Sequence, residues 1–368
     1  MKFTCNRDAL IEGINIVQKA IPGKSTLPVL EGILIEVGEE LILTGSDNDI
    51  SITYEVPSII EEIGGVVVSS KTFGEIIRKL PDIYLTIETA EEGRSLIIDS
   101  GNAHFEITYM EKSGYPKVDP LDTTDSLSIS QNNLKTLIRQ TAFSASQDNT
   151  RPILKGVLVE NKSGLLNFVA LDGFRLAIKN IDSSYDKDFS MIVSARVLNE
   201  LSKIIDPSDE FIYICSDNTQ IMFYNEKFKM ISRLLQGDFI DYTRMIPKEK
   251  KTVIKLNRKE FLAAVERVAI VLDDDRKKPI VIKNYDDEIV INVAGERGVS
   301  REVLSAEISG EEMELFFSSR HILECLRAVD EETINLDLTS PLHPVVIKSD
   351  DDDSFTFLVM PVRQPGTR

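Results

Sequence analysis

"RPILKGVLVE" at residues 151–160 has an earlier counterpart in "LPVLEGILIE" at residues 27–36. Five of the ten positions are identical, and three more exchange isoleucine for valine. The copies lie 124 residues apart, which is the length of a domain and too long for a solenoid repeat. This stretch therefore predicts a chain built from repeated domains.

Further segments recur with nearly the same spacing, and 368 residues are too many for one hydrophobic core. Three copies of one domain are predicted, at residues 1–125, 126–250 and 251–368. The recurring positions are Leu10, Leu134 and Leu262; Pro28, Pro152 and Pro279; and Lys71, Arg196 and Arg320.

Each copy contains two similar halves, in which a short alternating strand leads into an amphipathic helix. Apolar side chains recur at three- to four-residue spacing at Leu10, Ile14 and Val17, and again at Phe261, Leu262, Val265 and Val268. Ser70, Ser194 and Ser318 are the expected helix caps. The predicted fold class is α+β, with two helices against antiparallel sheets in each copy. The helices are expected at residues 6–20, 70–80, 130–145, 194–205, 257–271 and 318–329.

Charge is distributed unevenly along this acidic chain. The six predicted helices contain 14 cationic and 7 anionic side chains, whereas the whole chain has a net charge of −18. The remainder therefore has a net charge of −25. Basic helices in an acidic protein favour a surface that contacts the phosphate backbone of nucleic acid, although lysine and arginine on helices also serve solubility alone.

The sequence contains no recognisable catalytic or metal-binding arrangement. Its three cysteines and three histidines are scattered, so neither a zinc site nor a disulfide framework is expected, and no cofactor is predicted. "PGKST" at 22–26 lacks the first glycine of a phosphate-binding loop, because Gln18 stands there. The acidic runs at 273–275 and 350–353 lack the ligand spacing of a calcium loop. A non-enzymatic, cytoplasmic protein is expected, with no membrane contact.

An ordered set of motifs runs from residue 1 to about residue 363. The motifs are "MKFT", "LPVLEGILIE", "LTGSDNDISI", "RPILKGVLVE", "LDGFRLA", "DYTRMIP" and "VMPVR". Together they resemble the β subunits of bacterial DNA polymerase III, the sliding clamps.

The resemblance implies three clamp domains per chain and a head-to-tail homodimer that closes as a ring around duplex DNA. Helices would line the hole without reading base sequence, and the clamp would tether the replicative polymerase and so raise its processivity. The implied partners are the polymerase α subunit, the clamp-loader δ subunit, and other polymerases and repair proteins that carry a short clamp-binding peptide.

Two sources supply the expected DNA contacts. The family implies Lys24 and Gln147, and the cationic helices add Arg7, Lys71, Arg78, Arg139 and Arg196.

The family also implies a peptide pocket between the second and third domains. Phe174, Ile240 and Val362 differ from the residues of some relatives, which affects the expected peptide preference. The matching positions are Leu154, Leu171, Gly173, Phe174, Arg175, Leu176, Ile240, Arg244, Met245, Leu342, Pro344, Leu358, Val359, Met360, Pro361, Val362 and Arg363.

For the ring joint, the family pairs an edge strand of the first domain with one of the third. The matching positions are Ile76, Leu80 and Phe105 on one side and Ile270, Val271 and Leu272 on the other. The alternative is a three-repeat protein-binding scaffold that never encloses DNA. A nucleotide-dependent enzyme is a weaker alternative, because it needs the missing phosphate loop.

Overall fold

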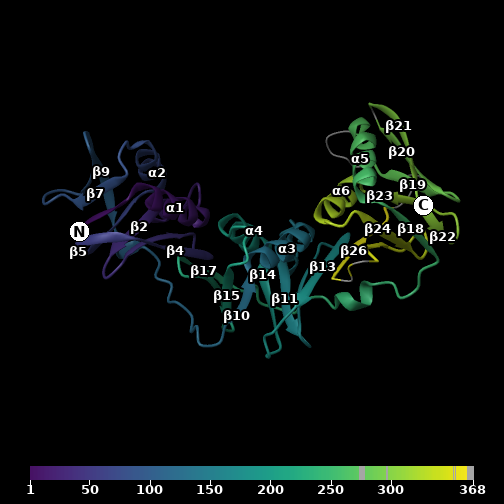
Figure 1. The fold of residues 1–368 in the computed structure, drawn as a ribbon, viewed down its shortest axis with the longest axis horizontal. Coiled ribbons are helices and arrows are strands. Elements are labelled where there is room, and N and C mark those ends of the chain that lie inside the picture. The colour runs from purple at the N-terminus through teal and green to yellow at the C-terminus, as the bar shows by residue number, and fades with distance from the viewer. Residues whose placement is uncertain (273–277, 296, 351, 353, 363–368) are drawn as a thin grey trace. The chain divides into compact units, whose positions relative to one another are not determined.

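The structure is a computed structural model that describes the chain except residues 273–277, 296, 351, 353 and 363–368. The chain packs as two compact units (Figure 1), each described here by itself. The first comprises residues 1–132 and 200–234, and the second comprises residues 133–199 and those from 235 onward. The segment predicted as a central domain, 126–250, contributes to both units, and the predicted boundaries stay a prediction.

The first unit contains a 13-stranded antiparallel sheet and the helices α1 (Arg7–Val17) and α2 (Ser70–Lys79). The sheet order is β10-β15-β16-β17-β4-β3-β2-β6-β9-β8-β7-β1-β5. The strands are β1 (Lys2–Asn6), β2 (Gly32–Val37), β3 (Leu41–Ser46), β4 (Ile50–Val56), β5 (Ser58–Glu62), β6 (Gly64–Ser69), β7 (Tyr84–Thr89), β8 (Ser95–Ser100), β9 (Ala103–Glu111), β10 (Leu127–Ser130), β15 (Phe211–Ser216), β16 (Gln220–Tyr224) and β17 (Phe228–Arg233).

The second unit contains the helices α5 (Arg258–Val268) and α6 (Ser319–Ala328) and two antiparallel sheets. Helices α3 (Gln131–Thr141) and α4 (Ala195–Ile204) run across the divisions between the units. The nine-stranded sheet contains, in order, β14 (Phe189–Ser194), β11 (Gly156–Lys162), β12 (Leu165–Leu171), β13 (Arg175–Asp182), β26 (Phe355–Val359), β25 (Val345–Lys348), β24 (Thr333–Leu338), β18 (Thr252–Asn257) and β22 (Glu307–Ser309). The four-stranded sheet contains β21 (Gly298–Ser305), β20 (Glu288–Gly295), β19 (Ile280–Asn284) and β23 (Glu314–Phe317).

The duplicated stretch forms the same local structure twice. A short 3-10 helix, η2 (Pro28–Glu31) or η5 (Pro152–Lys155), leads directly into β2 or β11. The glycine that begins each strand leaves no room for a side chain, because a Cβ on Gly32 or Gly156 would lie 2.4 Å from a methyl group of the neighbouring strand. This close approach explains why both copies keep the glycine.

All six predicted helices are present, and their apolar spacing faces the core. Leu10, Ile14 and Val17 are buried on α1, where the side chain of Asn6 accepts hydrogen bonds from the first turn. Asn257 does the same for α5, on which Phe261 is buried and Leu262 only half-buried. Asparagine caps of this kind satisfy amide groups that have no partner inside the helix.

The predicted serine caps are partly wrong. Ser70 is the first residue of α2 and is buried, and the preceding Ser69 accepts the hydrogen bond from Thr72 N. Ser318 stands at the cap position of α6, but its side chain makes no capping hydrogen bond within the described part of the chain. Neighbouring serines look alike in sequence, so the strand that precedes each helix decides which one caps it.

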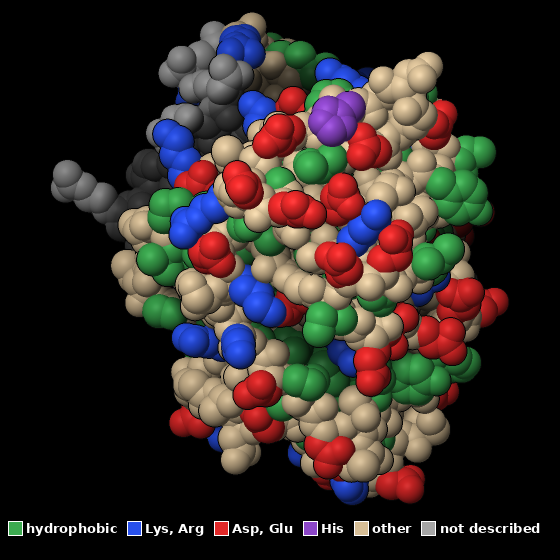
Figure 2. Space-filling model, turned by 90° about the vertical axis from the view of Figure 1, so that its left-hand side faces the viewer, with side chains coloured by type: hydrophobic (Ala, Val, Ile, Leu, Met, Phe, Trp, Pro, Cys, Tyr) green, Lys and Arg blue, Asp and Glu red, His purple; other side chains and the backbone are tan. Residues whose placement is uncertain are grey.

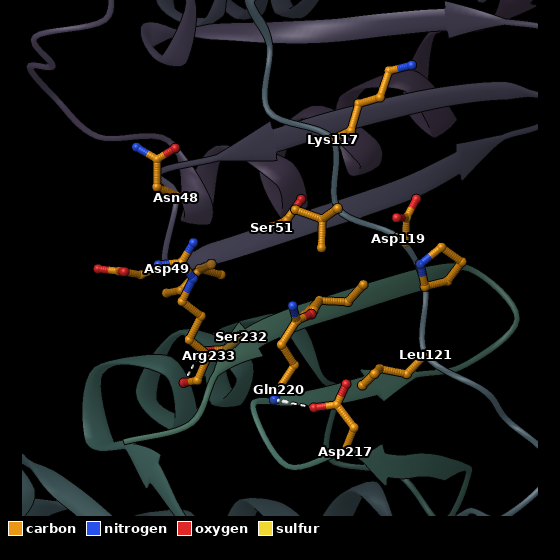
Figure 3. A pocket seen from close by; sticks show the side chains of 14 residues that line it. Asn48, Asp49, Ser51, Lys117, Asp119, Leu121, Asp217, Gln220, Ser232 and Arg233 are labelled. Carbon is orange, nitrogen blue, oxygen red and sulfur yellow. Dashed lines mark hydrogen bonds between the residues drawn. The ribbon is translucent and has the colours of Figure 1, made fainter. Parts of the chain in front are cut away.

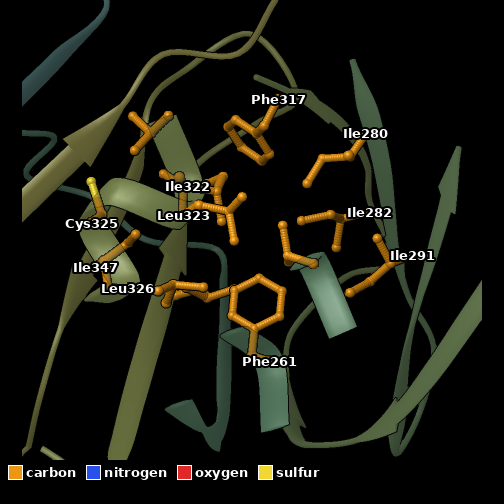
Figure 4. Close-up of a cluster of buried hydrophobic side chains, with 14 of the residues drawn as sticks. Phe261, Ile280, Ile282, Ile291, Phe317, Ile322, Leu323, Cys325, Leu326 and Ile347 are labelled. Carbon is orange, nitrogen blue, oxygen red and sulfur yellow. The ribbon is translucent and has the colours of Figure 1, made fainter. Parts of the chain in front are cut away.

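In the second unit, α5 and α6 contribute to one large hydrophobic core. Figure 4 shows Phe261 from α5 and Phe317 from β23 facing the same cluster as Ile282 and Ile322. Each of these side chains is at most 2% exposed. The core therefore joins the helix pair to strands of both sheets.

Candidate nucleic-acid and partner-binding surfaces

The observed helices are cationic, as predicted. Within the bounds of α1 to α6, 13 cationic and 7 anionic side chains give a net charge of +6. Lys19, which the prediction included, lies in the 3-10 helix that follows α1. Several of these cations are held by carboxylates; for example, Arg267 pairs with Glu302 at 2.7 Å and Arg327 with Glu266 at 2.8 Å.

Arg78 belongs to a polar network that joins α1 to α2, which lie side by side in Figure 1. Its guanidinium donates to Asn15 Oδ1 at 2.7 Å and to Gln18 Oε1 at 2.8 Å. The amide of Gln18 in turn donates to the carbonyl and the hydroxyl of Ser70, both at 3.0 Å. Arg78 is therefore an exposed cation held in a fixed position.

Arg7 and Arg139, two of the predicted DNA-contact residues, are held by other groups of the protein. The side chain of Arg7 is only 25% exposed and donates to the Leu80 carbonyl at 2.7 Å and to the Asp8 carboxylate. Arg139 donates to the Ala328 carbonyl at 2.8 Å and pairs with Asp330, beyond the end of α6. Both arginines tie elements together.

The other predicted DNA-contact residues lie on the surface. Lys24 is exposed in a bend before η2, and Lys71 is exposed at the start of α2. Gln147 is exposed after the 3-10 helix η4 (Ala142–Ser144), and Arg196 is exposed in the first turn of α4.

Many of the predicted pocket residues meet in one part of the second unit. Leu154, Leu171, Leu176 and Leu358 are at most 3% exposed and belong to one hydrophobic cluster, against which Met245 packs. The strands β13 and β26 supply its centre, with Leu176 paired opposite Leu358. These buried leucines can form only the floor of a docking surface.

A tight turn before β13 presents Phe174. The Asp172 carboxylate accepts from Phe174 N at 2.8 Å and from Arg175 N at 3.1 Å, and Gly173 has a left-handed backbone with φ of 92°. Phe174 is 61% exposed, its ring lies 6.0 Å from that of His321, and its carbonyl accepts from Met360 N at 2.8 Å.

Arg175 is a buried cation below the turn. Its side chain is 5% exposed, pairs with Asp172 and Glu324, and donates to the Phe143 carbonyl at 2.7 Å. Burial lowers the pKa of this guanidinium, and the Asp172 carboxylate opposes that shift. Arg175 therefore positions the turn, and neither Glu324 nor Phe143 was predicted, because both are far from it in sequence.

The remaining predicted pocket residues range from exposed to buried. Ile240 is 43% exposed and Leu342 82% exposed, and the Arg244 side chain is 86% exposed beside Asp241. Val359 is buried, and Arg363 lies outside the described residues. The half-buried members are Pro344, Met360, Pro361 and Val362.

On the first unit, the predicted joint residues lie near a strand with an unpaired edge. Residues 103–108 of β9 pair with β8, and residues 109–111 pair with β6. Phe105 is 38% exposed on this strand, Ile76 is half-buried, and Leu80 is buried. Figure 2 views the side on which β5, β7 and β9 lie and shows apolar groups interspersed with acidic and basic ones.

On the second unit, Ile270 is 70% exposed, whereas Leu272 belongs to the buried core. The edge strand beside them is β21, which ends the four-stranded sheet and, among the described strands, pairs with β20 alone. Its exposed residues Val299 and Val303 were not among the predicted positions. No apolar alternation in "GVSREVLS" marks them in the sequence.

The described residues contain no group of three histidine, cysteine or acidic side chains arranged to hold a metal ion. Cys5, Cys215 and Cys325 are reduced and buried. No helix in the described part of the chain is long and apolar enough to span a membrane.

Comparison with known protein families gives three consecutive matches. Residues 1–119 match the N-terminal domain of the DNA polymerase III beta subunit, residues 128–241 its central domain, and residues 243–363 its C-terminal domain.

Individual relatives are similar over the full length. The beta sliding clamp of Bacillus subtilis is 33% identical over 377 residues, which cover 99% of this chain and 100% of the relative. The crystal structure of the B. subtilis DNA polymerase sliding clamp has a TM-score of 0.95 at 33% identity and covers 99% of both chains. That of the Pseudomonas aeruginosa DNA polymerase III subunit beta has a TM-score of 0.94 at 26% identity, over 99% of this chain and 100% of that one.

Proposed function

The chain belongs to the DNA polymerase III beta-subunit family, the beta sliding clamps, and on that premise we propose how its surfaces carry out the clamp function. It is a sliding clamp: a non-catalytic processivity factor that encircles duplex DNA and tethers a DNA polymerase. The observation that carries this function is the similarity to beta sliding clamps over the whole chain, through all three domains. The place of action is proposed to be the cytoplasm.

Exposed cations on the helices, together with Lys24 in the bend before η2, are the proposed DNA-facing groups. Lys24, Lys71, Arg78 and Arg196 would meet phosphates without reading bases, which suits a device that moves along any sequence. Gln147 would add a polar contact. Arg7 and Arg139, which are tied to Leu80 and Asp330, would act mainly by fixing the helices.

The apolar floor below Phe174 is the proposed docking surface for partner peptides. Buried leucines, with Phe174, Ile240 and Leu342 exposed on the same unit, suit a short apolar segment. Met360 beside them has a flexible side chain that can adapt to different partners. The polymerase α subunit, the clamp-loader δ subunit and other proteins with such a peptide are the proposed occupants.

The ring is proposed to close head to tail through the unpaired edges of β9 and β21. Phe105 on one chain would meet Ile270 and the exposed valines of β21 on the other. This pairing would also cover two exposed strand edges, which could otherwise pair with other chains and cause aggregation.

Retention on DNA tests the enclosing function. The protein, loaded by a clamp loader onto nicked circular DNA, is expected to stay bound through gel filtration and to be released when a restriction enzyme linearises the circle. Equal retention on circular and linear DNA would contradict enclosure and favour the scaffold alternative.

The contact residues are tested separately from enclosure. We expect the Lys24→Ser, Lys71→Ser, Arg196→Ser triple variant to bind DNA more weakly, with a smaller dependence on salt, because each lost phosphate contact removes about 0.9 from the log–log slope. A matched triple at Lys162, Lys229 and Lys248, which lie outside the helices, is the control. An unchanged salt slope in the first triple would contradict the assignment.

A further inference from the structure

A polar hollow lies within the first unit, apart from the surfaces assigned above. Its volume is about 350 Å³, within the range of ligand sites in proteins. Figure 3 shows the three chain segments that form it: the turn before β4, the strands β16 and β17, and the segment 117–121.

The turn that forms one wall has the same geometry as the turn that presents Phe174. Asp47 Oδ1 accepts from the backbone amides of Asp49 at 3.0 Å and of Ile50 at 2.9 Å. Asp172 Oδ1 accepts from Phe174 and Arg175 in the same way, 125 residues later. Asp49 therefore occupies the position of Phe174.

The strand pairing repeats as well. Arg233 N donates to the Asp49 carbonyl at 3.2 Å, as Met360 N donates to the Phe174 carbonyl at 2.8 Å. Ser51 pairs opposite Ile231 on β17, as Leu176 pairs opposite Leu358 on β26. The hollow is thus the counterpart, within the internal repeat, of the proposed peptide-docking surface.

The connecting segments that follow each repeat also pack alike. Val118 and Leu121 pack against the cluster that contains Ile231. In the second unit, Phe239 and Tyr242 pack against the cluster that contains Leu358. Both sites therefore have an apolar floor and a connecting segment along one side.

The two sites differ in the side chains around that floor. The apolar pair Phe174 and Met360 is replaced by the charged pair Asp49 and Arg233, and neither of these side chains makes an ion pair with another described residue. Lys117 and Asp119 add a second cation and anion from the connecting segment. The Oε1 atom of Gln220 is buried in the wall without a hydrogen-bond donor among the described groups.

We propose that this hollow is a second docking site, which takes a short extended segment of a partner protein carrying one acidic and one basic side chain. The acid would pair with Arg233, the base with Asp49, and a backbone or side-chain N–H would donate to Gln220. An apolar segment is rejected there, because it would strip water from unpaired charges. The inference rests on the proposed function only in using the Phe174 surface as its reference.

Isoleucine methyl groups report the two sites separately. Ile50 and Ile231 line the hollow, and Ile240 lies at the proposed apolar site. The full-length protein, labelled at isoleucine δ1 methyls, is titrated at low salt with blocked pentapeptides Ser-Lys-Ser-Glu-Ser and Ser-Glu-Ser-Lys-Ser, and with apolar Ser-Leu-Ser-Phe-Leu. At least one charged peptide is expected to shift Ile50 and Ile231 but not Ile240, and 0.5 M salt is expected to remove the shift.

Two variants make the assignment specific. Asp49→Ser with Arg233→Ser is expected to abolish the response of Ile50 and Ile231, whereas Glu92→Ser with Arg94→Ser on a distant turn leaves it intact. Asp49→Phe with Arg233→Met is expected to make Ile50 and Ile231 respond to the apolar peptide, with the other isoleucine signals unchanged as proof of folding.

The proposal is overturned if neither charged peptide moves Ile50 and Ile231, or if the apolar peptide moves them in the unaltered protein. If the apolar peptide does not shift the Ile240 methyl signal, this result would instead contradict the docking surface proposed for the second unit. In that case the signals of Ile50 and Ile231 alone would still decide whether the hollow binds the charged segment.

Discussion

Arg175 shows how one buried charge organises its surroundings. It joins the turn before β13 to α6 through Glu324 and to the segment after α3 through the Phe143 carbonyl. Arg175→Met would leave the largely buried Asp172 carboxylate without its cation, whereas Glu324 keeps Arg320 as a partner, so we expect a loss of about 3 kcal/mol in the free energy of unfolding. Arg175→Lys keeps the positive charge but not the several N–H donors of the guanidinium. Its loss of unfolding free energy is expected to be smaller.

Urea denaturation measures both variants. Arg244→Met is the matched control, because its side chain is 86% exposed and should change stability by no more than about 0.5 kcal/mol. Equal midpoints for Arg175→Met and the unaltered protein would show that the buried network contributes nothing.

The buried thiols predict a loss of stability in alkaline solution. Burial raises the pKa of Cys325 from 9.0 to about 12. Below pH 9 the thiol is protonated in both states, so it adds no pH dependence. Between pH 9 and 12 only the unfolded chain releases the proton, and stability falls by up to about 1.4 kcal/mol per pH unit.

Cys325→Ala tests this slope. The variant is expected to have a smaller decrease in unfolding free energy between pH 9 and 11 than the unaltered protein, in addition to a pH-independent cost of the lost sulfur atom. Parallel curves over that interval would contradict a raised pKa for Cys325.

Residue identities in the candidate docking surface could be predicted only in part. Leu154, Leu171 and Leu358 were expected by resemblance, and the structure brings them into one cluster. The burial of Arg175 could not be predicted, since Phe143 and Glu324 become its neighbours only after strands and helices from distant segments have packed.

At the scale of elements, the asparagine caps provide a direct test. Asn6 accepts from Asp8 N at 2.8 Å, and Asn257 accepts from Lys259 N at 2.9 Å. Asn6→Ala and Asn257→Ala are each expected to cost about 1 kcal/mol of unfolding free energy. Thermal and urea denaturation should agree on this cost.

Ser318→Ala is the matched control for these caps. Ser318 occupies the same position before α6 but makes no capping hydrogen bond to a described residue, so the substitution is expected to cost less. A larger loss for Ser318→Ala than for either asparagine variant would contradict the capping account.

Helices were easier to predict than strand edges. Six segments have apolar residues at helical spacing, because one face of each helix is buried in the core. The strands β19, β20 and β21 follow one another along the chain, but the edge position of β21 depends on where the later strand β23 pairs, and β23 pairs with β19. The exposed valines of β21 therefore became recognisable only with the sheet order known.

At the scale of the whole molecule, ring closure predicts a homodimer in solution. Phe105→Glu would place a charge in the proposed joint, and sedimentation is expected to show a shift toward monomers of 41.3 kDa. Ile59→Glu on β5 is the control, since Ile59 is 70% exposed but lies outside the proposed joint. A dimer of unchanged affinity in Phe105→Glu would contradict this position of the joint.

Overall charge would have been misleading by itself. A net charge of −18 suggests a protein that avoids DNA, and only the division between the helices and the rest of the chain indicated that the helices are cationic. The internal repeat was the stronger guide, because Gly32 and Gly156 report the same packing in two places.

The repeated strand pairing creates a risk that β4 pairs with the wrong strand during folding. The final strand β26 resembles β17, so it offers β4 a competing partner. A ribosome makes β17 more than 120 residues before β26, and at about 5–20 residues per second the delay amounts to several seconds. During translation, β4 can therefore pair with β17 before β26 has been made. When the complete polypeptide refolds from denaturant, both strands are present from the start.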